Sequence, residues 1–193
     1  EKGTLKLDKP SSQVSSMNAN ADYPLKAQGE VKLEVLPEDI FAVLMNPDRL
    51  KNVIPGCESI HKKSIANGIR YDCIAIVRIG IAKARFAAQV DLTNVQSPDS
   101  FVLGGEGRGP LGMALGMGQV SLKRDGNATM LIYVYQAQVS GKLAAIGSRL
   151  LEGAIRLVLD QLFRALAKEA GAKQEGLFKS LITKLFVLLG VAK

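Results

Sequence analysis

The chain of 193 residues is long enough for one domain with tails, and 47% hydrophobic against 22% charged residues exclude an intrinsically disordered protein. The formal net charge is +7, and the segment 171–193 has four lysines but only one acidic residue. No run of basic residues with interleaved aromatics occurs, which argues against nucleic-acid binding, whereas the basic C-terminal segment fits an anionic membrane surface.

The N-terminal residues 1–26 are rich in serine, asparagine, lysine and proline without sustained periodicity. We therefore expect a flexible leader there, followed by a domain at 27–171. Alternating apolar residues predict a strand at 29–35. Pro37 with the two acids after it predicts a short helix at 40–45, and Asn46-Pro47-Asp48 predicts the start of another at 49–54.

The region from Cys57 to Val139 has the alternating pattern of β-strands. Asn67-Gly68 is a strong hairpin signal between strands at 59–65 and 69–79. Further strands are predicted at 84–93, 101–105, 118–123 and 128–139. Consecutive hairpins make the expected sheet antiparallel, with about seven strands.

Residues 142–170 read as one long amphipathic helix that must cover the sheet. Its apolar stripe consists of Leu143, Ile146, Gly147, Leu150, Leu151, Ala154, Ile155, Val158, Leu159, Leu162, Phe163, Leu166 and Ala167. If the sheet curves, helix and sheet can enclose an apolar cavity. The small residues Ala144, Ala145, Gly147, Gly153 and Ala154 would leave room there. The predicted fold class is therefore α+β, and the pattern points to binding of an apolar molecule.

The strand at 128–139 is apolar on both faces, with Met130, Ile132 and Val134 opposite Leu131 and the tyrosines. The second apolar face is either a partner surface or buried beneath the leader or the C-terminal helix.

The glycine-rich stretch 104–118 contains a G-x-G-x-x-G match at 107–112, but Pro110 and the lack of a strand–turn–helix context argue against a dinucleotide site. We expect a pliable loop or bent strand instead. A loop could be an ordinary surface loop or a flap over the cavity mouth, with Met113 and Met117 on its apolar side.

No catalytic or metal-binding constellation is identifiable. His61 is the only histidine and lies beside two lysines, which indicates a surface position. Glu30, Glu34, Asp72 and Asp91 fall on polar strand faces, and no cluster has metal-ligand spacing. Cys57 and Cys73 do not oppose each other in the hairpin register, so we expect free thiols in a cytosolic protein.

The C-terminal segment 172–193 contains an apolar run of 15 residues, which is short of the ~20 needed to span a bilayer. We expect an amphipathic helix in the membrane interface, with packing on a partner or on the domain itself as alternatives. The expected membrane-contacting residues are Leu177, Phe178, Lys179, Leu181, Ile182, Lys184, Leu185, Phe186, Leu188 and Leu189.

Five short motifs together resemble the family of the carbon monoxide dehydrogenase G subunit, over about residues 28–170. They are Asn46-Pro47-Asp48-Arg49-Leu50, the stretch 54–59 (IPGCES), the stretch 105–109 (GEGRG), the stretch 137–143 (AQVSGKL) and the stretch 147–153 (GSRLLEG). The leader lies outside this resemblance, and the apolar tail is found in only part of the family.

The resemblance implies a START-like helix-grip fold with a hydrophobic cavity. It also implies an accessory protein of molybdenum hydroxylases, chiefly carbon monoxide dehydrogenase, which tethers the enzyme at the inner face of the cytoplasmic membrane. Such a protein would carry a quinone or other isoprenoid lipid, with no covalent cofactor and no catalytic residues of its own. The alternatives are a ligand-free recruitment adaptor and an enzyme of the same fold, such as a cyclase or aromatase.

The sequence pattern suggests which residues line the cavity, and Tyr71, Tyr133 or Tyr135 could donate a hydrogen bond to a quinone carbonyl. The predicted lining residues are Tyr71, Cys73, Phe86, Phe101, Leu103, Leu111, Met113, Leu115, Met117, Tyr133, Tyr135, Leu143, Ile146, Gly147, Leu150 and Ala154.

Overall fold

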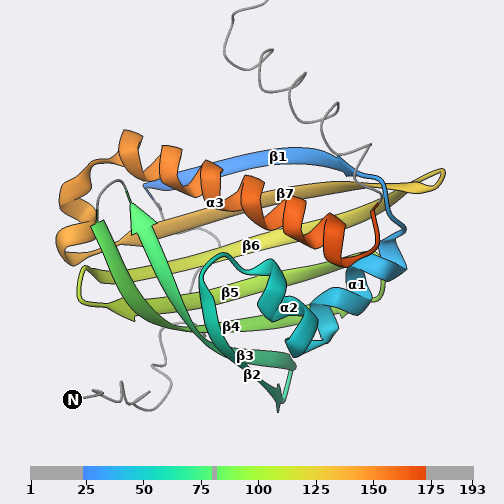
Figure 1. Ribbon diagram of the computed structural model, residues 1–193, viewed down its shortest axis with the longest axis horizontal. Coiled ribbons are helices and arrows are strands. Elements are labelled where there is room, and N and C mark those ends of the chain that lie inside the picture. Colours follow the sequence, from blue (N-terminus) through green and yellow to red (C-terminus); the bar gives the residue numbers. More distant parts are fainter. Residues whose placement is uncertain (1–23, 80–81, 173–193) are drawn as a thin grey trace, which may run out of the picture.

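The computed structural model describes residues 24–79 and 82–172. Within them, one antiparallel sheet of seven strands is covered on one face by helices (Figure 1). The helices are α1 (Pro37–Met45), α2 (Pro47–Val53), the 3-10 helix η2 (Gly141–Ile146) and α3 (Ser148–Glu169). The strands are β1 (Leu25–Leu33), β2 (Cys57–Ile65), β3 (Gly68–Ile79), β4 (Ala82–Gln96), β5 (Ser100–Gly109), β6 (Gly112–Asp125) and β7 (Ala128–Val139). The predicted α+β architecture is confirmed.

The strand order is β1-β7-β6-β5-β4-β3-β2. Strands β2 to β7 are therefore neighbours in chain order, and β1 is added as an edge strand beside β7. The predicted hairpin at Asn67-Gly68 is present, with Ile65 opposite Gly68. Further along this hairpin Cys57 pairs with Ala75 and Cys73 with Ile60, and both cysteines are free thiols as expected.

The two short helices are fixed by local signals and by one long-range contact. Pro37 occupies the first turn of α1, and the Asn46 side chain accepts hydrogen bonds from the backbone N–H groups of Asp48 and Arg49 at the start of α2. Arg49 then donates from Nη2 to the carbonyl oxygen of Glu169 at 2.5 Å. This contact ties α2 to the C-terminal end of α3.

Apolar side chains between helices and sheet form two separate clusters. The larger joins α1, α2 and the C-terminal half of α3 to the sheet, and includes Phe41, Tyr71, Phe101, Leu131 and Phe163. The smaller lies where η2 meets the sheet. It consists of Ala84, Phe86 and Leu143, packed with Val77, Leu111, Val139 and Ile146.

Three expectations need correction. Strand β1 begins at Leu25, two residues before the expected domain start. The single helix at 142–170 is wrong in its first turn, because Gly147 adopts a positive φ of 91° and separates η2 from α3. The small residues Ala144, Ala145, Gly147 and Gly153 are all exposed, and Ala154 lies on the same side of α3 as the exposed Leu150, so these residues do not leave room between helix and sheet.

The glycine-rich stretch is not a flap. Most of it belongs to β5 and β6, and only Pro110-Leu111 forms the turn between them. A Cβ at Gly105 or Gly109 would approach backbone oxygens of β4 to 2.9 and 2.8 Å, so glycine is needed where β5 lies very close to its neighbour. The bent-strand alternative is the correct one.

Candidate ligand-binding site

Strand alternation divides the sheet into an inner face beneath the helices and an outer face. Leu92 of β4, Phe101 of β5, Leu122 of β6 and Leu131 of β7 belong to the core with Phe163 of α3, so they define the inner face. Residues an even number of positions from them share that face.

Between the two apolar clusters, the inner face carries only small side chains on β4, β5 and β6, and on β7 it carries Ala137 beside Tyr135. The small residues are Ala88 of β4, Gly105 and Gly107 of β5, Ala114, Gly116 and Gly118 of β6, and Ala137 of β7, which we call the small-residue floor. All seven remain partly exposed, although they lie in the middle of the sheet.

The floor has free space above it. A Cβ built at Gly107 would meet only Ala88 Cβ at 3.7 Å and the Ala87 carbonyl oxygen at 3.9 Å. One built at Gly116 would meet only atoms of β7, at 3.5 and 3.6 Å. Among the described residues, no atom of α3 or η2 lies within 4 Å of either position. Helix α3 therefore does not pack directly on these two glycines.

Two tyrosines border the floor on the inner face of β7. Tyr133 and Tyr135 stack with ring centroids 6.5 Å apart, and Tyr133 also lies 5.2 Å from Phe163 of α3. Among the described residues neither hydroxyl has a hydrogen-bond partner. Burial raises the pKa of both tyrosines, so both remain protonated donors at neutral pH.

Tyr71 has a different role from the one predicted. Its side chain is buried in the larger cluster, and its hydroxyl donates to the Leu44 carbonyl oxygen at 2.7 Å. That donor is already used to hold α1 against the sheet, so it is not available for a ligand. Burial raises the pKa of Tyr71 to about 12.

Four predicted lining residues are wrong. Met113, Leu115 and Met117 alternate with the floor positions of β6 and therefore lie on the outer face, where they pair across to Arg108, Glu106 and Gly104. Leu150 projects from α3 into solvent and is 68% exposed.

Seven other predicted lining residues lie on the inner side at the edges of the floor, and their contact with a ligand stays a prediction. Cys73 is on β3 next to Ala88, and Phe101 and Leu103 are on the side of the larger cluster. Phe86, Leu111, Leu143 and Ile146 belong to the smaller cluster. The remaining two do not border the floor, because Gly147 is exposed at the junction of η2 and α3 and Ala154 lies on the same side of α3 as the exposed Leu150.

The floor itself was missed in the sequence. The signal was available, because counting back in steps of two from Leu122 and Val120 leads to Gly118, Gly116 and Ala114. The prediction instead placed the larger apolar residues Met113, Leu115 and Met117 on the inner face, although they alternate with it.

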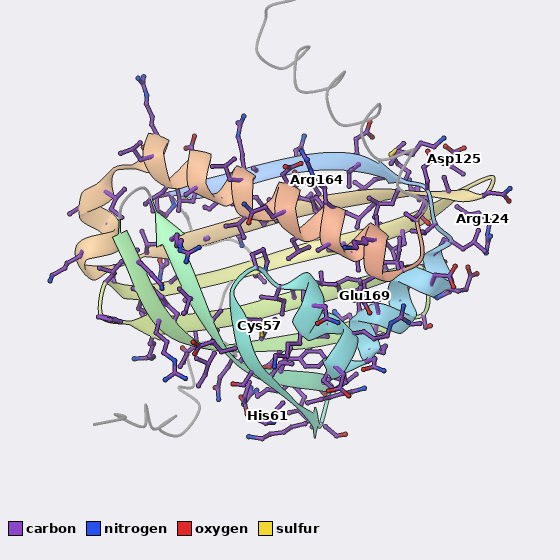
Figure 2. All side chains as sticks on the ribbon, viewed as in Figure 1. Cys57, His61, Arg124, Asp125, Arg164 and Glu169 are labelled. Carbon is purple, nitrogen blue, oxygen red and sulfur yellow. The ribbon has the colours of Figure 1, made fainter. Side chains whose placement is uncertain are left out.

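Polar residues on the outer face have a structural explanation. Asp72 is only 3% exposed, and its two carboxylate oxygens contact Gln89 Nε2 at 2.9 Å and Lys63 Nζ at 2.5 Å. His61 is exposed on the edge strand β2, as predicted, and Figure 2 shows it away from α3. The residues 24–79 and 82–172 contain no group of three or more potential metal ligands.

One shallow pocket of about 250 Å³ lies far from the floor. Its lining comes from the segment between β1 and α1, the β6–β7 turn and the end of α3, and includes Glu34, Asp39, Asn127 and Gly171. It is open and polar, which does not suit a lipophilic ligand.

Comparison with known protein families matches residues 29–171 to CoxG, the G subunit of carbon monoxide dehydrogenase. The chain belongs to this family. No protein with a curated description matches the sequence significantly.

Solved structures share the fold. A conserved protein from Geobacillus kaustophilus matches with a TM-score of 0.70 at 29% identity, over 76% of this chain and 95% of that one. The Zhui aromatase/cyclase from Streptomyces sp. R1128 matches with a TM-score of 0.56 at 14% identity, over 76% and 93%. TTHA0849 from Thermus thermophilus gives 0.57 at 13%, over 76% and 97%. The predicted START-like helix-grip fold is confirmed.

The expected membrane-contacting residues from Leu177 to Leu189 lie outside the described residues, as does most of the leader. Within the described part of the chain, no helix combines the length and hydropathy needed to cross a membrane.

Proposed function

We propose that this member of the CoxG family is a non-enzymatic carrier that binds a lipophilic molecule, a quinone, between the small-residue floor and α3. The observation that carries the proposal is the floor itself. Side chains are reduced to hydrogen or methyl on β4, β5 and β6 and at Ala137 of β7, and no described helix atom lies within 4 Å of a Cβ built at Gly107 or Gly116. An isoprenoid chain placed there would gain about 0.8 kcal/mol for each CH₂ removed from water.

The two tyrosines supply the polar contact that a quinone head group needs. A quinone carbonyl oxygen accepts hydrogen bonds, and Tyr133 and Tyr135 present donors beside the floor without a competing partner among the described residues. The pKa of each is raised by burial, which keeps the donor form present at physiological pH. No other described group at the floor combines these properties.

Membership of the CoxG family supports a molybdenum hydroxylase as the partner protein. We propose that the chain links a molybdenum hydroxylase of the carbon monoxide dehydrogenase type to the quinone pool, at the cytoplasmic face of the membrane. The sequence of the C-terminal segment, with four lysines and many leucines, supports a peripheral membrane location. Deletion of residues 176–193 is then expected to reduce liposome binding and leave the thermal unfolding of the domain unchanged.

The proposed ligand is tested by native mass spectrometry of the full chain purified without detergent, followed by solvent extraction. We expect a quinone or related isoprenoid at about one molecule per chain, because the floor is proposed as one binding site. A ligand-free mass, together with no uptake of added menaquinone or ubiquinone, would contradict the carrier and favour a recruitment adaptor. Conversion of the added molecule into a new product would contradict the non-enzymatic role.

A further inference from the structure

Helix α3 exposes large apolar side chains on the side that faces away from the sheet. Leu150, Leu157 and Val158 are 68%, 65% and 39% exposed. Together with Ala154 they follow i, i+4, i+7 and i+8 spacing, so they lie along one side of the helix. We call these four residues the outer strip. Solvent-exposed leucines in adjacent turns commonly mark a contact surface.

The outer strip has two different edges. On one edge Val158 is three residues from Ile155 and seven from Leu151, so the apolar surface continues around the helix to the side above the floor. On the other edge lie the arginines Arg149, Arg156 and Arg164. An apolar strip with cations along one side has the distribution of a helix lying in a membrane interface.

The charge of the surrounding surface points to an anionic partner. Lys142, Arg149 and Arg156 are exposed and make no ion pair with another described residue, and Glu152 is the only acid nearby that is likewise unpaired. Arg164 is the exception, since it pairs with Asp160 at 2.9 Å.

Further unpaired cations come from the sheet. Arg78 lies near the end of β3 and Lys83 near the start of β4, where they pair on the outer face of the sheet. Both are exposed without an ion-pair partner among the described residues. Their neighbours Val77 and Ala84 pack with η2 in the smaller cluster, and Figure 1 shows these strand ends rising towards the start of α3.

At the opposite end of the sheet, several cations are neutralised by acids. Arg124 pairs with Glu38, Lys32 with Asp125, and Arg49 with Glu169, and Figure 2 shows Arg124, Asp125 and Glu169 at that end. Lys123 and Lys168 are exposed there without an ion-pair partner among the described residues. The end of the domain that carries η2 and the first turns of α3 therefore attracts anions more strongly than the other end.

We propose that the outer strip and the cations around it form the surface that lies against an anionic lipid bilayer. The leucines would enter the interface while Lys142 and Arg149 meet phosphate head groups. This orientation puts the apolar edge at Val158 at the membrane. Transfer of a quinone from the membrane to the floor along this edge rests on the proposed function, whereas the contact of the strip with lipid is tested separately.

The absence of tryptophan from the chain allows a direct test. Leu157→Trp in the full chain creates a single reporter in the strip, with Leu150→Trp as a second reporter. Val134→Trp is the matched control, because Val134 is a 51% exposed apolar residue on the outer face of the sheet. Each variant is mixed with phosphatidylcholine vesicles with or without phosphatidylglycerol, and with brominated lipids as quenchers.

We expect the emission of the Leu157→Trp variant to shift to shorter wavelength and to be quenched by brominated lipid on phosphatidylglycerol vesicles, while that of the Val134→Trp variant stays unchanged. Adding Lys142→Gln and Arg149→Gln to the reporter should lower vesicle partitioning by about tenfold or more. Arg156 is kept because it interacts electrostatically with Tyr133 and Tyr135. Uptake of menaquinone from vesicle-free solution should be the same with and without the two substituted cations, so loss of docking and loss of ligand binding are separate results.

Three outcomes would overturn the proposal. The chain could sediment with vesicles while both strip reporters remain unquenched, which would assign the contact to another part of the chain. The chain could fail to bind phosphatidylglycerol vesicles at all. The strip reporters could instead change emission with protein concentration in the absence of lipid, which would assign the strip to a second copy of the chain.

Discussion

The Tyr133 ring lies flat across Gly29 of the neighbouring strand, so close that a Cβ at that glycine would be 2.6 Å from the tyrosine hydroxyl oxygen. Glycine at position 29 therefore lets the ring reach over β1 while its other side contacts Phe163. The orientation of a proposed ligand donor thus depends on the absence of a side chain on the adjacent strand.

Gly29→Ala is expected to displace the Tyr133 ring, because a Cβ cannot occupy a position 2.6–3.0 Å from three ring atoms. We expect a loss of about 1–3 kcal/mol in the free energy of unfolding, as for an overpacked core, and weaker quinone binding. Urea unfolding and ligand titration measure the two effects. Unchanged affinity would show that the position of this hydroxyl does not matter to the ligand.

Gly153→Ala is the matched glycine substitution away from the ring. Gly153 is exposed in α3, and a Cβ there meets nothing within 4 Å among the described residues. Alanine should stabilise the helix by about 0.5–1 kcal/mol and leave ligand affinity unchanged. Urea midpoints compare it with the parent, and a destabilised variant would show that Gly153 contacts something outside the described residues.

The hydroxyls of Tyr133 and Tyr135 are expected to act on the ligand and not on the fold. Neither has a hydrogen-bond partner among the described residues, so phenylalanine should change stability little at either position. Loss of a donor to a quinone carbonyl should weaken binding by about 2–10-fold, the equivalent of one neutral hydrogen bond.

Tyr71→Phe provides the contrast, since it removes the bond to the Leu44 carbonyl. It should cost about 1–3 kcal/mol of stability without lowering quinone affinity. Weaker quinone binding by the Tyr71→Phe variant, with unchanged binding by the Tyr133 and Tyr135 variants, would show that Tyr71 is the residue that contacts the ligand.

Alkaline pH is expected to destabilise the domain because two buried groups, Cys73 and Tyr71, lose their protons more readily in the unfolded chain. Burial raises the pKa of Cys73 from 9.0 to about 11 and that of Tyr71 from 10.0 to about 12. The unfolded chain therefore loses these protons first. The stabilisation is complete below pH 9 and disappears as pH rises through 11 and 12. Melting temperatures measured from pH 8 to 12 should fall in this window, and less steeply for Cys73→Ala and Tyr71→Phe relative to their own values at pH 8. Parallel curves for parent and variants would exclude these two groups as the cause.

Much of the fold could be predicted because its signals are local. Asn67-Gly68 determines a hairpin, Asn46 caps α2, and the alternation through Phe86, Val90 and Leu92 sets the inner face of β4. Each signal depends on a few neighbouring residues, and most elements formed within about four positions of the expected bounds. The exceptions are β6, which begins six residues before the expected start, and the C-terminal helix, which is divided at Gly147.

The candidate site could be predicted only in part, because glycine carries no hydrophobic signal. Between Gly104 and Gly118 the alternation of apolar and polar residues disappears. The prediction therefore placed Leu115 on the inner face because it is hydrophobic, and this was wrong. Leu150 satisfies the helical spacing, but the stripe is wider than the surface that α3 buries. The break at Gly147 depends on the positive φ of a single residue, which the amphipathic pattern conceals.

The central claim is that the space above the small-residue floor holds the ligand, and filling it is the most direct test. Gly107→Val and Gly116→Val point side chains into that space from two strands, where a Cβ meets no atom closer than 3.5 Å. Menaquinone uptake by the full chain should be measured for the parent and the double variant, with circular dichroism and thermal unfolding as the check on folding. We predict about one menaquinone per parent chain and none in a folded double variant, because the two valine side chains would occupy the space proposed for the ligand. Equal uptake by a folded double variant would show that the ligand, if bound, lies elsewhere.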